Sequence, residues 1–292
     1  MSVVGETIGR RVVDPARRIR RIEPTHRRLP LTLREARELW AYRELLFFLV
    51  WRDVKVKYKQ TAIGASWAIL VPFTQMVLFT VIFNRALHVK SEYHVPYPLF
   101  SYTALLPWMY FQSCLGGSSM SIVGNQNLIT KVWFPRLLIP LAAVFAPVID
   151  FLLAFCVLVG MFVFYGRTPH WHAVVIPVFL LMALLTAFGV GLWLSALNVR
   201  YRDIPYALPF LTQIWFFATP VLWGITAVKP STQRLLGLNP MTGVIDGFRW
   251  SVLGRGLPHY TLYAESLGIG LLILVSGLWY FKRVERYFAD LI

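Results

Sequence analysis

The chain has 292 residues, of which 57% are hydrophobic and only 15% are charged, and this composition excludes an ordinary soluble domain with a single core. Several stretches reach about 20 residues with almost no charge, which is the length a helix needs to cross a bilayer. A net charge of +15 would suggest nucleic acid as the partner of a soluble chain. Here the Lys and Arg residues cluster in short segments between apolar runs, so we predict an all-α polytopic membrane protein with no nucleic-acid partner.

The N-terminal residues 1–30 are rich in Arg, contain three prolines and hold no apolar run. We therefore expect a basic, disordered cytoplasmic tail rather than a signal peptide. Within residues 31–62, apolar residues recur at helical spacing opposite Arg and Glu, and Thr32 and Glu35 have capping-box spacing. This pattern predicts an amphipathic interface helix followed by a basic band, and the residues of interest in that helix are Leu39, Trp40 and Arg43.

The remainder of the chain predicts six transmembrane helices. Of the 29 Lys and Arg residues, 22 fall in segments that this arrangement assigns to the cytoplasm and seven fall in outer segments. That bias places both termini in the cytoplasm. The expected spans are 63–87, 98–122, 137–165, 173–197, 205–228 and 263–281.

A polar and basic island, GNQNLITKVWFPRLLIP, separates the second and third expected spans at residues 124–140. Asn125 and Asn127 offer N-cap side chains, and Pro135 would end a helix. Four apolar residues at helical spacing would share one side of it: Leu128, Ile129, Val132 and Trp133. We predict a short amphipathic helix at the membrane surface that a second protein contacts.

The longest outer segment, about residues 229–261, is neither a span nor a simple loop. Its stretch NPMTGVIDGFRWSVLG is apolar but is interrupted by Asp246 and Arg249. We expect a re-entrant or interfacial helix before the last span, because irregular backbone at membrane depth is tolerated only where it packs on protein or lines a cavity.

Catalytic motifs are missing from the sequence. No Gly-Lys pair occurs, so the chain has no P-loop, and it has no Asp-x-Asp, HExxH or GxSxG motif. Cys114 and Cys156 lie in apolar runs without metal-ligand spacing, and we expect both to be small buried side chains. We predict that the chain is not an enzyme and holds no cofactor or metal of its own.

Two features of the apolar runs are candidates for transport chemistry. Asp150 is the one acid deep inside an apolar run, where it would serve either as a proton relay or as an acid hydrogen-bonded or hydrated within the bundle. Aromatic residues make up 15% of the chain, and most should form interface belts or packing. The candidates for lining a conduit, where rings could stack on sugars, are Trp108, Tyr110, Phe111, Trp215 and Phe216.

Three segments in this order resemble one family: NQNLITKVWFPRLLIPL, LSALNVRYRDIPYALPFLTQIWFFATPVLW and NPMTGVIDGFRWSVLG. From about residue 31 to 292 the chain looks like the permease subunit of polysaccharide ABC exporters of the ABC-2 type, which export O-antigen, capsule and teichoic-acid polymers. The resemblance implies a multi-pass homodimer in the cytoplasmic (inner) membrane, with residues 63–292 as its transmembrane domain. It also implies two copies of a separate P-loop ATPase that binds ATP and Mg, membrane lipid around the dimer and a lipid-linked polysaccharide as cargo.

The resemblance also assigns roles to residues. The coupling helix that contacts the ATPase would include Asn125, Asn127, Leu128, Lys131, Trp133, Phe134 and Arg136. The second cytoplasmic loop would be Arg200, Arg202 and Asp203, with the last two paired, and an outer gate would include Asn239, Pro240, Asp246, Arg249 and Trp250. Rival interpretations stay open: Lys131 and Arg136 as topology markers only, and Arg249 as a head-group anchor.

Other functions are also compatible with parts of the sequence. An ion-gradient-driven transporter or flippase would need no ATPase and would make Asp150 essential. An ABC-2 exporter could carry a small lipid or a drug instead of a polymer. A membrane glycosyltransferase would need a carboxylate cluster at one membrane face, and no such cluster is visible in the sequence.

Overall fold

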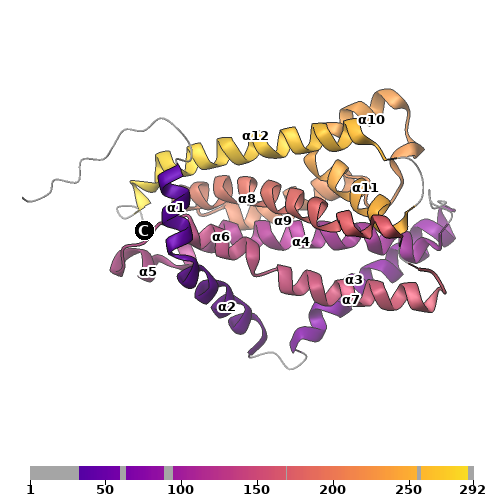
Figure 1. Ribbon diagram of the computed structural model, residues 1–292. Coiled ribbons are helices and arrows are strands. Elements are labelled where there is room, and N and C mark those ends of the chain that lie inside the picture. The colour runs from indigo at the N-terminus through magenta and orange to yellow at the C-terminus, as the bar shows by residue number, and fades with distance from the viewer. Residues whose placement is uncertain (1–32, 60–63, 89–94, 169, 255–257, 289–292) are drawn as a thin grey trace, which may run out of the picture.

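The computed structural model describes residues 33–59, 64–88, 95–168, 170–254 and 258–288. Every regular element in these ranges is helical, which confirms the predicted all-α fold. The predicted basic tail and the Thr32–Glu35 cap lie outside the described residues and side chains. One end of the bundle carries α1, α2, α5 and the last turns of α12, and the other end carries α10 and α11 (Figure 1).

The predicted interface helix is two helices, α1 (Leu33–Ala41) and α2 (Arg43–Lys59), which meet at Tyr42. The Tyr42 amide there donates to the carbonyls of both Glu38 and Leu39, at 3.2 Å each. Exposed tryptophan and phenylalanine side chains along both helices agree with a position at the head-group boundary.

The first expected span is one continuous helical run that is made of three types of helix. A 3₁₀ turn (η1, Gly64–Ser66) leads into α3 (Trp67–Phe79), and a π-helix (η2, Thr80–Ala86) ends it. Most of its apolar side chains are exposed in the single chain. Such a surface needs lipid or another protein against it.

The centre of the bundle is α4 (Tyr97–Gly124), which is buried along most of its length. It packs against α8 (Ile176–Arg200), which follows the short η3 (Trp171–Val175), and α8 packs against α12 (Tyr260–Glu285). Glycine makes the contact between α8 and α12 possible, because a Cβ on Gly189 would lie 2.7 Å from the backbone of Leu274. Small residues of this kind let membrane helices approach closely.

The third expected span is interrupted. After α5 (Gln126–Lys131), α6 (Leu138–Phe145) and α7 (Val148–Phe164) are separated at Ala146 and Pro147, consistent with the effect of proline on the preceding turn. Together they still form one apolar stretch long enough to cross a membrane.

The fifth expected span is wrong beyond Phe217, where α9 (Ile204–Phe217) ends. A turn and three outer elements follow: η4 (Ile225–Ala227), α10 (Pro230–Gly237) and α11 (Pro240–Leu253). In the described part of the chain, four stretches are long and apolar enough to span a membrane, namely 64–86, 138–164, 171–200 and 260–285, and α9 is a shorter apolar helix. The predicted count of six spans is therefore not confirmed.

Candidate functional site

The island between the second and third expected spans does form a helix, but a shorter one than expected. α5 has six residues and ends at Lys131, and Val132 is already extended, so Pro135 is not what stops it. Asn125 sits at the N-cap position, yet its amide Nδ2 donates to the Ser121 carbonyl at 2.8 Å and does not cap α5. The N-cap prediction for Asn125 and the single apolar face are therefore both wrong.

Side chains of the coupling segment, residues 125–136, divide into an inner and an outer set. Ile129 and Phe134 are buried within the subunit, whereas Val132 is exposed and Trp133 is 81% exposed. Phe134 is thus less accessible to a partner than Trp133, and its contact with one stays a prediction. Trp133 presents a large apolar side chain to the outside, which a surface residue rarely does without a partner.

Arg136 joins the coupling segment to the end of α12. Its guanidinium donates to the carbonyl of Glu285 at 2.6 Å and lies 5.9 Å from the ring of Phe288. The last carbonyls of a helix lack intrahelical partners and attract cations, so this contact is favourable. Arg136 is therefore more than a marker of topology.

A cavity of about 920 Å³ opens beside the coupling segment. Its walls are residues 129–137, Glu38 and Leu39 of α1, and the α12 end with Lys282, Glu285 and Arg286. Leu39 faces this space, while Trp40 is exposed with Arg43 6.0 Å from its ring. The structure thus brings α1, the coupling segment and α12 to one surface, although they are far apart in sequence.

The predicted second cytoplasmic loop, between α8 and α9, is small and exposed. Arg200 ends α8 and lies 5.4 Å from the ring of Tyr201, and Arg202 and Asp203 point to solvent. Within the described residues no ion pair joins Arg202 to Asp203, so the predicted local pair is wrong. Asp203 instead uses its backbone carbonyl, which accepts from Tyr206 and Ala207 as α9 begins.

At the opposite end, Asn239 and Pro240 begin α11. The Asn239 Oδ1 accepts from the Met241 amide at 3.1 Å and from Trp215 Nε1 at 2.9 Å, and its Nδ2 donates to Thr219 Oγ1 at 2.8 Å. Pro240 suits the first helical position because its missing N–H would have no partner there. One side chain therefore caps α11 and fixes the end of α9 against it.

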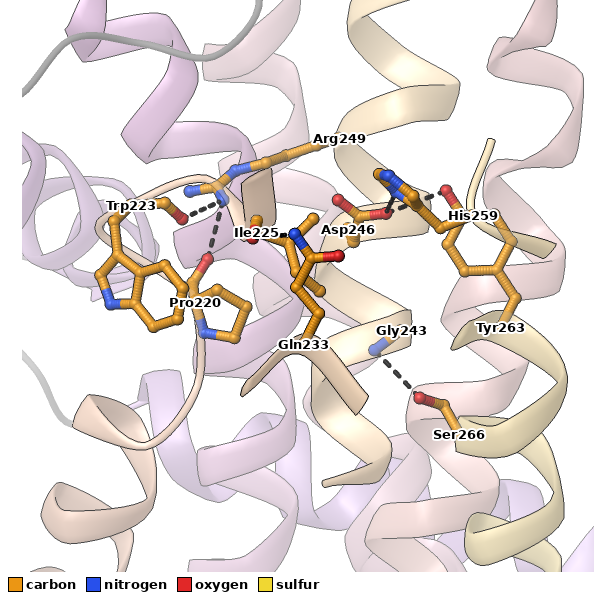
Figure 2. Close-up of polar contacts among 10 residues, drawn as sticks. All are labelled: Pro220, Trp223, Ile225, Gln233, Gly243, Asp246, Arg249, His259, Tyr263 and Ser266. Carbon is orange, nitrogen blue, oxygen red and sulfur yellow. Dashed lines mark hydrogen bonds and ion pairs between the residues drawn. The ribbon is translucent and has the colours of Figure 1, made fainter. Parts of the chain in front are cut away.

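Arg249 is buried at 2% exposure in the middle of α11. Its guanidinium donates to the carbonyls of Pro220 at 2.7 Å and Trp223 at 3.0 Å (Figure 2). It also donates to the carbonyl of Val221, which lies in the same turn after α9. The ring of Phe100 lies 3.8 Å from its charge centre. Backbone carbonyls and an aromatic face thus satisfy this cation, and its burial excludes the head-group anchor interpretation.

Asp246 lies one turn before Arg249 and is 3% exposed. Tyr263 donates its hydroxyl to Asp246 Oδ2 at 3.1 Å, and His259 Nδ1 lies 2.8 Å from the same oxygen (Figure 2). Ser266 Oγ accepts from the Gly243 amide at 3.1 Å. These contacts tie α11 to the first turns of α12, while Trp250 is partly buried against the ring of His172, 4.4 Å away.

The candidate conduit aromatics do not line an open path. Trp108, Tyr110 and Phe111 are buried in the core of the bundle, so the conduit interpretation is wrong for these three in this conformation. Trp215 and Phe216 are partly buried and pack on Phe111 and Trp108. Among the exposed aromatics, three recur along one side of α9 at a helical spacing that the sequence already shows: Tyr206, Phe210 and Phe217, with exposed Gln213 between them.

Asp150 lies in the first turn of α7, near the middle of the apolar stretch 138–164, as predicted. Its carboxylate pairs with the ammonium of Lys57 and accepts the hydroxyl of Tyr58, both from the last turn of α2. Of the two sequence interpretations, this favours the acid that is hydrogen-bonded within the bundle. The partners come from the predicted basic band, 93 and 92 positions earlier, so spacing could not reveal them.

The two cysteines differ. Cys114 is buried, with its Sγ 3.5 Å from the Val144 carbonyl, but Cys156 is exposed, so its predicted burial is wrong. Across the residues that the structure describes, no group of three or more His, Cys, Asp or Glu side chains gathers where a metal could bind.

Comparison with known proteins gives a consistent result. The profile of the family described as "ABC-2 type transporter" matches residues 44–253. The O-antigen export system permease protein RfbA of Myxococcus xanthus is 30% identical over 261 residues, which is 88% of this chain and 99% of that protein. A protein of the same name from Klebsiella pneumoniae is 28% identical, covering 85% and 95%. The polysialic acid transport protein KpsM of Escherichia coli is 22% identical, covering 80% and 91%.

Proposed function

The chain belongs to the ABC-2 type transporter family, and from that premise we propose that it is the membrane subunit of a complex that exports a lipid-linked polysaccharide through the cytoplasmic membrane. The observation that carries the proposal is the match with an O-antigen permease along 99% of that protein's length. A separate ATPase supplies the energy and holds the ATP and Mg. Two copies of this chain and two of the ATPase form the complex, with both termini of the chain in the cytoplasm.

The docking surface for the ATPase is the wall of the 920 Å³ cavity together with Trp133 and Val132. Four cations border this cavity: Lys131, Arg136, Lys282 and Arg286. An apolar cleft rimmed by acidic residues on the partner would match this surface, because complementary charge guides association while a buried aromatic side chain supplies most of the affinity.

Movement at this surface reaches the outer end through α12. Arg136 holds the coupling segment on the Glu285 carbonyl. At the other end of the same helix, the first turns of α12 hold α11 through Ser266 and Tyr263. A displacement of the coupling segment therefore has a continuous helix to act on. In this mechanism ATP binding shifts a two-state equilibrium, and α11 is the outer element that moves.

The polymer passes between two copies of the chain, along exposed faces of α3 and α9. Tyr206, Phe210 and Phe217 recur on one side of α9, with Gln213 among them. Flat rings can contact the apolar faces of sugars without fixing their position, and an amide can exchange hydrogen bonds with sugar hydroxyls. Such a lining suits a sliding polymer better than a tightly held small molecule.

The test is co-purification from native membranes in mild detergent. A P-loop ATPase should be recovered in equal amount, and ATP turnover should appear only in the complex. Trp133→Ala should lower ATPase recovery about tenfold, as the loss of one buried aromatic anchor does. The matched control is Trp171→Ala, since Trp171 is 74% exposed in the other half of the chain and should leave recovery unchanged.

Two results would reject the proposal. Recovery of the chain alone, with transport driven by an ion gradient, would favour the secondary transporter and would make Asp150 the residue to pursue. Equal ATPase recovery with both tryptophan variants would show that the docking surface lies elsewhere.

A further inference from the structure

The contact between α11 and the start of α12 joins a buried acid to a histidine that solvent can reach. The Asp246 side chain is 3% exposed, whereas the His259 side chain is 35% exposed. His259 Nδ1 lies 2.8 Å from Asp246 Oδ2, and the Tyr263 hydroxyl donates to the same oxygen at 3.1 Å. A buried carboxylate needs donors or an opposite charge, and histidine changes its charge near neutral pH. The strength of this contact therefore depends on whether His259 carries a proton.

His259 is the ion-pair partner of Asp246 in the part of the chain that the structure describes. The cation on the same helix, Arg249, points instead toward the turn at residues 220–223 and donates to its carbonyls (Figure 2). A proton on His259 turns a neutral hydrogen bond into a charge-assisted one, which is about twice as strong. Acid therefore strengthens the attachment of α11 to α12.

The other groups around α11 do not replace His259. α11 packs against α4, α8, α10, α12 and η3. Residues 176–187, the outer half of α8, carry no titratable side chain. At this end α4, α10 and α12 present three phenols, two cations and one acid, namely Tyr97, Tyr102, Tyr260, Lys229, Arg234 and Glu265. Among the described ion pairs, none joins one of these groups to Asp246.

The end of α11 rests on two histidines that form no ion pair within the described residues. His170 packs so closely on Gly254 that a Cβ there would lie 2.1 Å from its own Cβ. The rings of His170 and His172 stack at 4.3 Å, and Arg167 borders the same cavity as His170. The buried Nδ1 of His172 has no hydrogen-bond partner in the described part of the chain. Protons on both rings would place like charges together and leave a buried donor unmatched, so acid does not strengthen this contact.

We propose that a proton on His259 regulates how firmly α11 is attached to α12, which makes the outer end of the protein sensitive to the acidity outside. With the proton bound, opposite charges fasten the middle of α11 to α12. As the pH rises through the range in which histidine loses its proton, this contribution is lost. Acid thus holds α11 in the described arrangement, and a neutral or alkaline outside releases it. The consequence for export rests on the proposed function, in which α11 is the element that moves.

The experiment measures amide hydrogen exchange by mass spectrometry in the purified full-length chain in detergent. The two conditions, about pH 6 and about pH 8.5, lie on either side of the usual histidine range, and each rate is corrected for the intrinsic effect of pH. Exchange proceeds by local opening, so it reports how firmly α11 is held. Residues 244–248 should be about three- to tenfold better protected at the lower pH, because one pH unit of proton linkage is a factor of about ten. Residues 250–253 should not gain protection.

Two variants test the histidine. His259→Gln keeps a hydrogen-bond donor but cannot gain a proton, so residues 244–248 should be equally protected at both pH values. The matched control is His88→Gln, since His88 is an exposed histidine that follows η2, and this variant should respond to pH as the natural chain does.

Equal protection of the natural chain at both pH values would overturn the proposal, and so would a response that survives His259→Gln or disappears in His88→Gln. An equal gain in residues 250–253 would also overturn it, because the effect would then not be local. Should His259→Gln fail to fold, Tyr263→Phe decides: it removes the other donor to Asp246, so the response should be at least as large, and a smaller one would count against the proposal.

This measurement needs neither the ATPase nor the polymer. Its failure would leave the proposed export function standing. Failure of the ATPase to co-purify would in turn leave the proton-dependent contact between α11 and α12 standing, so the two proposals can be rejected separately.

Discussion

The charged side chains that mark the two ends of the bundle differ in their exposure to solvent. At the α5 end, Trp133 and Lys131 are exposed beside a wide cavity. At the α11 end, Arg249 and Asp246 are buried and each is fully engaged, by carbonyls on one side and by α12 on the other. The difference suggests that the first end is built for contact with a partner and the second for holding one arrangement.

If this comparison is right, substitutions at the α11 end should cost stability, and substitutions at the α5 end should cost partner binding instead. Four variants test it, in decreasing order of expected effect on the stability of the subunit.

Arg249→Met should be the most destabilising. It leaves the carbonyls of Pro220, Val221 and Trp223 without their donor, and each orphaned buried acceptor costs about 1–3 kcal/mol. We expect a total loss of about 3 kcal/mol or more in the free energy of unfolding, measured by thermal unfolding in detergent. Arg234→Met, at an exposed position of α10, is the control. A loss no larger than that of the control would mean that the α11 end is not held together by Arg249.

Gly247→Ala should follow. A Cβ at this position would lie 2.0 Å from the ring of Phe179, so this buried ring or α11 itself would have to shift. Overpacking of this kind costs about 1–3 kcal/mol, again read from thermal unfolding. Gly268→Ala on α12 meets nothing within 4 Å and should be neutral or slightly stabilising. Equal unfolding temperatures for Gly247→Ala and Gly268→Ala would show that α11 is not closely packed against α8 at Gly247.

Arg136→Met should have a smaller effect on stability, about 1 kcal/mol, because the lost hydrogen bond is charge-assisted but only partly buried. Its main effect should be on the partner, because Arg136 borders the proposed docking surface: ATPase recovery and export should both fall. Both are measured side by side, with the exposed Arg234→Met of α10 as the control. Export that stays normal would remove Arg136 from the coupling route.

Trp133→Ala should leave the stability of the subunit within about 0.5 kcal/mol, since an exposed side chain contributes little to folding. The unfolding temperature of the subunit without its partner is the measurement. A clear drop would mean that Trp133 serves the fold itself, and the contrast between the two ends would then fail.

The sequence predicted the parts of this fold that depend on local pattern. Long apolar runs predicted the helices, and the polar island predicted a helix near α5. The prediction from sequence failed where a contact with a residue far away in the chain determines the local structure. The apolar run beyond Phe217 looked like a continuing span, but Arg249 binds the carbonyls of Pro220 and Trp223 and holds a turn there.

The same limit applied to the candidate functional site, where contacts between residues far apart in sequence could not be predicted. Adjacent positions such as Trp133 and Phe134 differ completely in burial, because α5 has already ended and the chain bends there, so no helical periodicity relates the two side chains. No spacing connects Asp150 to Lys57 across 93 residues. The exposed aromatics of α9 were visible as a periodic pattern, but periodicity alone does not say which side of a membrane helix faces lipid.

The glycine contact between α8 and α12 has a mechanical consequence. A Cβ on Gly277 would lie 2.3 Å from the Gly189 carbonyl oxygen, and Trp193 stacks on Tyr280 at 4.2 Å further along the same pair. Two rods fastened at several points bend less than either rod alone. The 26 residues of α12, about 39 Å at the usual rise of a helix, therefore behave as one side of a stiff beam. A displacement at one end of this helix pair is therefore transmitted to the other end instead of being absorbed by bending of α12.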